Sequence, residues 1–222
     1  MRIALLGGTG DIGEGLALRW AYDTDHDVVV GSRDPEKARA KADEYETELD
    51  SRGLDRTVNG FDNEMAADRA DVVVLAVPAY HVGDVVESVS DVLDEDTILV
   101  SPAVGMSRDE DGMHYNPPGV GSVTELVQQR APADVRVVGA FHNLAADRLA
   151  NLDVEFDLDT LVVGDDEDAR ELVASLGGEI EGLRVLDAGA AANAAEAESV
   201  TPLVINIAMN NADMHDVGVR YL

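Results

Sequence analysis

The amino-acid sequence predicts an α/β protein with a doubly wound, mainly parallel sheet and a small C-terminal helical domain. Short runs of β-branched residues alternate with longer stretches of helical periodicity, which is the order of strands joined by crossover helices. The short runs show no polar alternation, so we expect strands that helices cover on both faces. The expected strands span residues 3–6, 28–30, 72–77, 98–100, 135–138 and 161–163. The expected helices span residues 14–22, 35–49, 82–93, 123–129 and 168–176.

The end of the chain differs in composition from the rest. An alanine-rich stretch over residues 190–197, followed by apolar residues 200–209, predicts a helical segment from about residue 189. We therefore divide the chain into a sheet-forming domain, residues 1–188, and a C-terminal helical segment, residues 189–222. That segment either packs against the core or a second subunit, or closes a substrate cleft, and both interpretations stay open. Residues 108–120 contain prolines and no periodicity, so we expect a connecting loop there rather than a lid.

The charge balance is strongly acidic, since 45 Asp and Glu against 16 Lys and Arg give a formal net charge of −29. Such a charge repels nucleic acid and anionic membranes, so neither is an expected partner. Hydrophobic residues make up 45% of the chain and the acidic residues are spread along it, which predicts a folded protein with a solvated acidic surface. Concentrated salt would screen the repulsion between these acids, so we interpret the composition as that of a halophile.

The chain contains no cysteine. This excludes disulfides, thiolate metal sites, iron–sulfur clusters and a cysteine nucleophile, and we expect no metal site of another kind. Redox chemistry would therefore depend on bound cofactors. The N-terminal apolar run is too short for a signal peptide, and no apolar stretch approaches the length of a membrane span. We expect a soluble, cytoplasmic protein.

A glycine motif follows the first expected strand. The segment Gly8-Thr9-Gly10-Asp11-Ile12-Gly13 has the spacing G-x-G-x-x-G and precedes a helix expected to begin near Glu14. Gly8 permits the tight turn, Gly10 lets a pyrophosphate approach the backbone, and Gly13 lets the helix pack closely on the strand. The helix N-terminus supplies positive potential for the phosphates. The motif in this context predicts a Rossmann-type dinucleotide-binding domain over residues 1–188 and disfavours a glycine turn without a ligand.

The choice between NAD and NADP is read at the end of the second expected strand. An acidic residue there would accept a hydrogen bond from the ribose 2′-hydroxyl, but this chain has Ser32 and Arg33 instead. Lys37 lies four residues further, one turn into the next helix. Hydroxyl, guanidinium and ammonium groups suit a phosphate, and Thr9 can add a fourth donor. We therefore predict NADP(H) as the cofactor.

Two further strand ends are expected to line the nicotinamide pocket. Pro78 stops one strand at the carboxyl edge of the sheet, where α/β proteins bind ligands, and the small residues that follow leave space. The next strand ends at residue 101. The predicted contacts are Val77, Pro78, Ala79, Gly83, Pro102 and Val104. Tyr80 and His81 are either further contacts or ordinary loop residues.

Several motifs together resemble one family. They are Gly7-Gly8-Thr9-Gly10, Gly31-Ser32-Arg33, Ala76-Val77-Pro78 and Thr201-Pro202-Leu203, with residues 150–153, 164–166, 182–184 and 186–189 between or after them. In this order the chain resembles archaeal NADPH-dependent reductases of coenzyme F420 nearly from end to end. The resemblance implies reversible hydride transfer between nicotinamide C4 and C5 of a deazaflavin. It also implies stacked rings in a cleft roofed by the C-terminal domain, and a homodimer.

The resemblance places His142, Ser199 and Thr201 beside the deazaflavin. No side-chain nucleophile or metal is implied, because both reacting atoms belong to cofactors. His142 is alternatively a histidine satisfied by backbone at a strand end. The chain departs from the family pattern at two places. Ala194 and Ala195 stand where the resemblance implies an arginine suited to the anionic deazaflavin, and Asp11 places an acid beside the pyrophosphate loop.

Two other functions stay open. One is an NADP-dependent reductase of a small carbonyl or imine, which would use a proton donor such as lysine. The two lysines, Lys37 and Lys41, both lie in the expected 2′-phosphate region, which disfavours that function. The other is a non-catalytic NADPH-sensing protein, for which no basic face or binding tail is present. Under the leading interpretation the partners are small-molecule cofactors and a second subunit.

Overall fold

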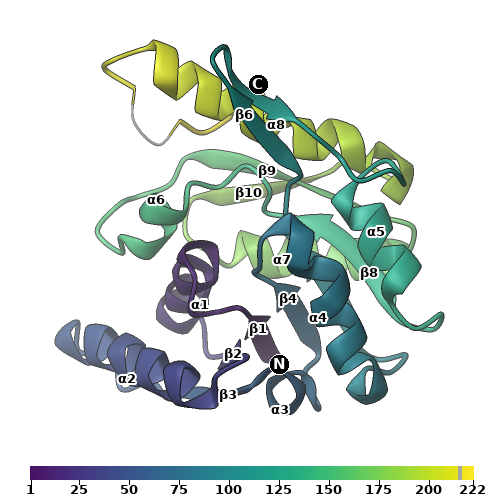
Figure 1. Ribbon diagram of the computed structural model, residues 1–222. Coiled ribbons are helices and arrows are strands. Elements are labelled where there is room, and N and C mark those ends of the chain that lie inside the picture. The colour runs from purple at the N-terminus through teal and green to yellow at the C-terminus, as the bar shows by residue number, and fades with distance from the viewer. Residues whose placement is uncertain (215–216) are drawn as a thin grey trace.

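A computed structural model describes residues 1–214 and 217–222 (Figure 1). Its centre is an eight-stranded sheet with the strand order β10-β9-β8-β5-β4-β1-β2-β3. Strands β8 and β9 pair antiparallel, and the other neighbours in the sheet pair parallel, which confirms the expected fold class. The strands are β1 (Arg2–Leu6), β2 (Asp27–Ser32), β3 (Val58–Asp62), β4 (Val72–Leu75), β5 (Ile98–Ser101), β8 (Arg136–Ala140), β9 (Leu158–Gly164) and β10 (Leu183–Asp187).

Helices cover both faces of the sheet (Figure 1). Alternate residues of β1 point to opposite faces, so Ile3 and Leu5 lie in the core with α1, α2 and α7, while Ala4 and Leu6 lie in the core with α3, α4 and α5. The helices are α1 (Asp11–Asp23), α2 (Pro35–Ser51), α3 (Asn63–Ala67), α4 (Val82–Val89), α5 (Val123–Arg130), α6 (Ala146–Ala150), α7 (Glu167–Gly178) and α8 (Ala194–Asn210). Three short 3-10 turns are η1 (Ala79–His81), η2 (Ser90–Val92) and η3 (Ala191–Asn193).

The strand order creates a topological switch point beside β1. The chain builds outward through β2 and β3, then crosses to the other side of β1 and continues through β4, β5 and β8. The loops after β1 and β4 therefore separate at the carboxyl edge, which is where open α/β sheets bind ligands. This edge carries the glycine loop and the strand ends on which the predicted site depends.

Two strands of the sheet were not expected from the sequence. Edge strands β3 and β10 carry Asn59, Arg184 and other polar residues, because one side of an edge strand meets solvent rather than another strand. Gly60 also weakens the apolar signal of β3. It is required by packing, since a Cβ there would overlap the Ala38 carbonyl of α2. The first helix begins at Asp11, three residues before the expected start near Glu14.

The loop expected over residues 108–120 is wrong, because an antiparallel hairpin of β6 (Met106–Asp109) and β7 (Gly112–Tyr115) occupies its first part. All four residues of β6 are exposed, so no apolar pattern marks it as a strand. The hairpin is held by α8, where Asn206 accepts a hydrogen bond from the Met113 N–H at 2.8 Å and donates to the Met113 carbonyl at 2.7 Å. This hairpin lies across α8 at one end of the molecule (Figure 1).

The helical C-terminal segment expected from about residue 189 is confirmed as η3 followed by α8. After α8 the chain returns to β9, where Val219 forms a β-bridge with Asp159. The fully buried Asp159 carboxylate accepts hydrogen bonds from Arg184 at 2.7 Å and from the Tyr221 N–H at 2.6 Å. The hydrogen bond from Arg184 lowers the pKa of Asp159 to about 2, although burial opposes it. The end of the chain is thus anchored through one buried charge.

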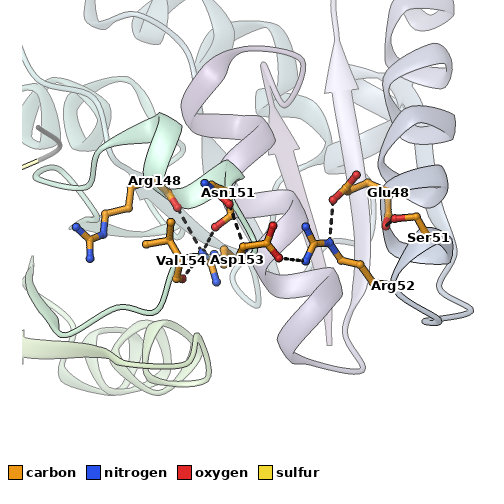
Figure 2. Close-up of polar contacts among 8 residues, drawn as sticks. Glu48, Ser51, Arg52, Arg148, Asn151, Asp153 and Val154 are labelled. Atoms are coloured by element: carbon orange, nitrogen blue, oxygen red, sulfur yellow. Dashed lines mark hydrogen bonds and ion pairs between the residues drawn. The ribbon is translucent and has the colours of Figure 1, made fainter.

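A buried arginine joins α1 to the segment around α6. Arg19 donates to the carbonyls of Leu149 at 2.9 Å, Asn151 at 2.6 Å and Val154 at 2.9 Å, and its guanidinium lies 4.3 Å from the Phe156 ring centre. Figure 2 shows Asn151 and Val154 close together in the segment after α6. The same figure shows Arg52, at the end of α2, between Glu48 and Asp153. Helix α1 and the end of α2 therefore hold residues 148–154 in place.

In residues 1–214 and 217–222, no helix combines the length and the apolar composition that crossing a lipid bilayer requires.

Candidate functional site

The glycine loop is closely packed at Gly7, which directly precedes the motif, and at Gly13. Gly7 adopts φ +81°, and a Cβ there would lie 2.5 Å from Val77 Cγ1, so backbone and packing both demand glycine. At Gly13 a Cβ would lie 2.6 Å from the Gly8 Cα, which explains the close contact of α1 with the loop. At Gly10 the Cβ would meet protein at the ordinary distance of 3.4 Å. Packing does not demand glycine at Gly10, which agrees with room kept for a ligand.

The start of α1 differs from the starts of α2, α5 and α7. Asp34, Ser122 and Asp166 accept hydrogen bonds from the first turns of α2, α5 and α7. The N-cap of α1 is Gly10, which has no side chain to do so. The first N–H groups of α1 therefore keep their positive potential for an anion. Ile12 and the exposed Asp11 lie in this first turn, and the Asp11 carboxylate adds a negative charge beside it.

A cavity of about 520 Å³ lies beside the glycine loop. It brings together six of the predicted cofactor residues from three separate segments of the chain, and these are Thr9, Ser32, Arg33, Lys37, Val77 and Pro78. Pockets that bind small ligands measure about 300–1,000 Å³, so this volume suits a large part of a dinucleotide. The structure thus gathers the phosphate-binding and strand-end predictions in one place.

The residues at the end of β2 are arranged to bind a phosphate. Ser32 Oγ accepts a hydrogen bond from the Asp34 N–H at 3.2 Å, which leaves the hydroxyl proton free to donate. The Asp34 carboxylate caps α2 by accepting from the N–H groups of Glu36 and Lys37. Its charge is therefore directed at the helix, where an acid is favourable. The side chains of Ser32, Arg33 and Lys37 therefore face the cavity as donors, while the carboxylate of Asp34 is already hydrogen-bonded to the start of α2.

Arg33 and Lys37 are both exposed, and neither forms an ion pair or a side-chain hydrogen bond with the described residues. Two exposed cations without an ion pair are unusual in this acidic chain, where most Lys and Arg side chains pair with a carboxylate. Ion pairs hold Arg2, Lys41, Arg52, Arg56, Arg69, Arg130, Arg170, Arg184 and Arg220. The two unpaired cations on one cavity wall fit a phosphate group that the protein itself does not supply.

His142 lies at the carboxyl end of β8, directly after Phe141, which has φ +66°. Its ring is buried, and neither ring nitrogen has a hydrogen-bond partner in the described part of the chain. Burial lowers the pKa of His142 to about 4, and the nearby Ser101 backbone offsets this in part, so the imidazole is neutral at pH 7. An unpaired buried polar group costs about 1–3 kcal/mol. The Ser101 backbone is thus near enough to act on the ring, and both interpretations of His142, a deazaflavin contact and a histidine satisfied by backbone, stay open.

Thr201 and His142 are brought together by the fold. Thr201 Oγ1 donates a hydrogen bond to the His142 carbonyl at 2.8 Å, joining α8 to the end of β8. Thr201 also lines an apolar cavity of about 340 Å³ between α8 and the loop after β8, with Ala145, Ala146 and Ala208. Ser199 is placed differently, because its hydroxyl donates to the Glu196 carbonyl of its own helix at 2.8 Å and it lines none of the cavities described here.

Comparison with known proteins agrees with this geometry. The family described as "NADP oxidoreductase coenzyme F420-dependent" matches residues 2–105. A Methanocaldococcus jannaschii protein named F420-dependent NADP reductase is 37% identical over 210 residues, covering 93% of this chain and 92% of the relative. A Methanothermobacter thermautotrophicus protein of the same name is 37% identical over 226 residues, covering 99% and 94%. This chain belongs to the F420-dependent NADP reductase family.

A solved structure from Arthrobacter sp. FB24, provisionally described as an F420-dependent NADP-reductase, is similar in fold. The TM-score is 0.76 at 26% identity, and the match covers 94% of both chains. The family match over residues 2–105 covers the dinucleotide half, from β1 to the base of the hairpin. The two archaeal F420-dependent NADP reductases extend the likeness to nearly the whole chain, including the half that carries His142 and α8.

The residues predicted to contact the nicotinamide do not all line the same cavity. Val77 and Pro78 line the first cavity, whereas Ala79 and Gly83 line a second cavity of about 510 Å³ between α4, α5 and the hairpin. Asp84 lines both, so the two are neighbours. Pro102 is buried and Val104 half-buried, and neither lines these cavities. His81 lines the first cavity and the 80% exposed Tyr80 lines the second, with ring centres 4.4 Å apart.

Sequence reasoning missed Glu198, a fully buried carboxylate of α8. It accepts hydrogen bonds from Tyr115 of the hairpin at 2.9 Å, from the Val123 N–H at 3.1 Å and from the Thr124 N–H at 2.9 Å. Burial raises the pKa of Glu198, and these donors oppose the rise. The signal that could have found it is its place as the last acid before the uncharged residues 199–211. Glu198 fixes the α8 turn that carries Ser199 and Thr201 against α5.

The structure also shows the surroundings of Ala194 and Ala195, at the start of α8. Ala194 is fully buried in a small cluster with Val163 and Ala197, so a long side chain there would displace α8 from β9. Ala195 is half-buried. The start of α8 is therefore a packing surface at the first of these two positions.

Proposed function

We propose that this protein transfers a hydride reversibly between NADP(H) and the deazaflavin coenzyme F420. The observation that carries the proposal is the cavity wall of Ser32, Arg33 and Lys37 at the end of β2, where two cations that have no partner among residues 1–214 and 217–222 suit a 2′-phosphate. The two curated relatives are named for the same pair of cofactors. The bound cofactors supply the hydride donor and acceptor carbons themselves.

The protein's own residues bind the cofactors, orient their rings and exclude water from the site. The free N–H groups at the start of α1 hold the pyrophosphate, and the absence of a side chain at Gly10 lets it approach. Val77, Pro78, Ala79, Gly83, Pro102 and Val104 remain the proposed nicotinamide side of the site. Neutral His142 offers polar atoms at the end of β8 without adding charge. A rigid wall of this kind favours transfer by holding two rings at reacting distance.

We propose that residues 1–188 bind NADP(H) and that residues 189–222 close the cleft over the second substrate. Thr201 is the best supported contact, because it lines an apolar cavity and holds the His142 backbone. His142 needs a side-chain rotation to reach a ligand, since both ring nitrogens are buried. Ser199 would likewise have to leave its bond to Glu196. No arginine at 194 or 195 assists the anionic deazaflavin, so its binding depends on these contacts and on salt.

The test is to mix the protein with oxidised coenzyme F420 and NADPH in molar potassium chloride and follow the deazaflavin absorbance. Loss of the absorbance supports the proposal. NADPH binding without any deazaflavin reduction would refute it. Turnover of a small carbonyl or imine would then identify that reductase class, and binding without any turnover would identify an NADPH sensor.

A variant separates the two cofactor sites. His142→Ala should weaken F420 turnover about five- to a hundredfold through the loss of one polar contact, with NADPH binding by calorimetry nearly unchanged. Equal loss of both cofactors would mean that His142 holds the cleft together and contacts neither.

We also propose a homodimer through the outer face of α8, in the cytoplasm of a halophile and with no nucleic-acid partner. Residues 199–211 contain no charge in a chain of net charge −29, yet Leu203 is 59% exposed and Met209 is 50% exposed. An uncharged, partly exposed helix face suits contact with a second copy. Light scattering should report a dimer for the wild type and a monomer for Leu203→Glu. A wild-type monomer at all concentrations would refute this assembly.

A further inference from the structure

The first cavity has a second wall that the phosphate-binding residues do not explain. Because β1 lies between β2 and β4, the segments after these two strands stand on two sides of the glycine loop. On the β4 side the cavity is lined by Asp84, Val85 and Ser88 of α4. Positions 84 and 88 are one helical turn apart and therefore share a face. This face needs a ligand group different from a phosphate.

The polar groups of this α4 face accept hydrogen bonds. Asp84 is an exposed carboxylate with no ion pair or hydrogen bond to the described residues, and at neutral pH it can only accept. The Ser88 hydroxyl donates its proton to the Val85 carbonyl at 2.8 Å, so only its lone pairs face outward. Val85 lies between them and offers an apolar surface to a flat ring. The face formed by Asp84, Val85 and Ser88 therefore suits a ligand that presents an N–H donor.

A third acceptor lies nearby on α3. Asn63 lines the same cavity and is 9% exposed, and its Oδ1 has no hydrogen-bond partner among the described residues. An acid in a phosphate-binding cavity weakens binding by repulsion, unless it contacts a donor on the same ligand. Adenine carries such a donor, its exocyclic 6-amino group, at the end of the nucleotide that also carries the 2′-phosphate.

We propose that Asp84 and Ser88, with Asn63, recognise the 6-amino group of the adenine base. The cavity then selects an adenine dinucleotide against one with hypoxanthine, which has a carbonyl oxygen in place of the amine and would face these acceptors with another acceptor. This inference rests on the proposed binding of NADP(H) in the same cavity.

The experiment compares NADPH with its deamino analogue, nicotinamide hypoxanthine dinucleotide phosphate, by calorimetry in molar potassium chloride. The wild type should bind NADPH about tenfold more tightly, the effect of one hydrogen bond to a charged acceptor. Asp84→Asn should bring the ratio close to one, because an amide can donate to the hypoxanthine carbonyl. Ser88→Ala should lower the ratio by a smaller factor. Asp91→Asn is the matched control, since it removes the same charge in η2 and does not line the cavity.

Two results would overturn the inference. One is a wild-type ratio of one. The other is an Asp84→Asn variant that binds both dinucleotides more tightly by the same factor, which would reduce Asp84 to a repulsive surface charge. Failure of the proposed NADP(H) binding is separate, because the wild type would then bind neither NADPH nor adenosine 2′,5′-bisphosphate. Binding of that bisphosphate with no discrimination between the bases would refute the base recognition alone.

Discussion

Replacement of Arg33 by alanine tests the central feature of the site. Arg33 is exposed, lines the first cavity and has no protein partner among the described residues, so its removal breaks no contact that holds the fold. The variant should fold and melt like the wild type. Its defect should be confined to ligands that carry a phosphate at the ribose 2′ position.

The size of the defect follows from the geometry at the end of β2. A hydrogen bond between two charged groups contributes about 1.5–3 kcal/mol, and exposure to solvent and salt reduces this toward the lower value. Lys37 and Ser32 remain in place and retain part of the phosphate binding. We therefore expect the Michaelis constant for NADPH to rise at least tenfold, or about 1.4 kcal/mol, and the weaker binding of NADH to change little.

The assay measures both constants for Arg33→Ala and for a matched control, Arg39→Ala. Arg39 is exposed like Arg33, but it lies within α2 and lines a different cavity with Ala42 and Asn59. The control changes the net charge by the same amount, so it reports the general effect of a more acidic surface. Equal effects of the two substitutions, or an unchanged NADPH constant in Arg33→Ala, would refute the assignment of the 2′-phosphate site.

Three further predictions concern stability. The pKa of His142 falls from 6.5 to about 4 on folding, so the unfolded chain takes up the proton first and stability is lost as the pH falls from 6.5 toward 4. The loss of unfolding free energy between pH 7 and pH 5 should be smaller by about 2 kcal/mol in His142→Gln, and an identical loss would contradict the buried neutral ring. Melting temperature should rise with potassium chloride up to molar concentrations, and a flat series would mean that the acidity has another cause. Arg19→Met should lower the unfolding free energy by about 3 kcal/mol or more, because buried carbonyls lose their donor, whereas Arg52→Met at the protein surface should have a smaller effect; equal effects would contradict this role.

The dinucleotide half could be predicted from the sequence because its signals are local. Gly8, Gly10 and Gly13 lie within six residues, and Ser32, Arg33 and Lys37 within another six. The strands on either side are buried on both faces and therefore appear as continuous apolar runs. The structure brings Thr9, Arg33 and Lys37 to one cavity, as that pattern predicts.

The second half depends on contacts between distant residues, which composition and spacing do not reveal. Glu198 meets Thr124 and Tyr115, and Asn206 meets Met113, across separations that no periodicity encodes. The hairpin was missed because β6 is wholly exposed and is held by α8 instead of by an apolar face. For the same reason the resemblance alone suggested His142, Ser199 and Thr201, and the contact of each with a ligand remains a prediction.

The polar contacts of α8 affect how the second substrate could be held. Within the described residues, Asn206 binds the hairpin, Glu198 binds the start of α5, and Thr201 binds the His142 carbonyl directly after Phe141, whose positive φ is uncommon for a residue with a side chain. All three tie α8 to loops at the carboxyl edge of the sheet. A substrate seated against Thr201 therefore meets a wall whose position is set by the same edge that holds the dinucleotide. The distance between two stacked rings would then depend on the sheet, and less on closure of a separate domain.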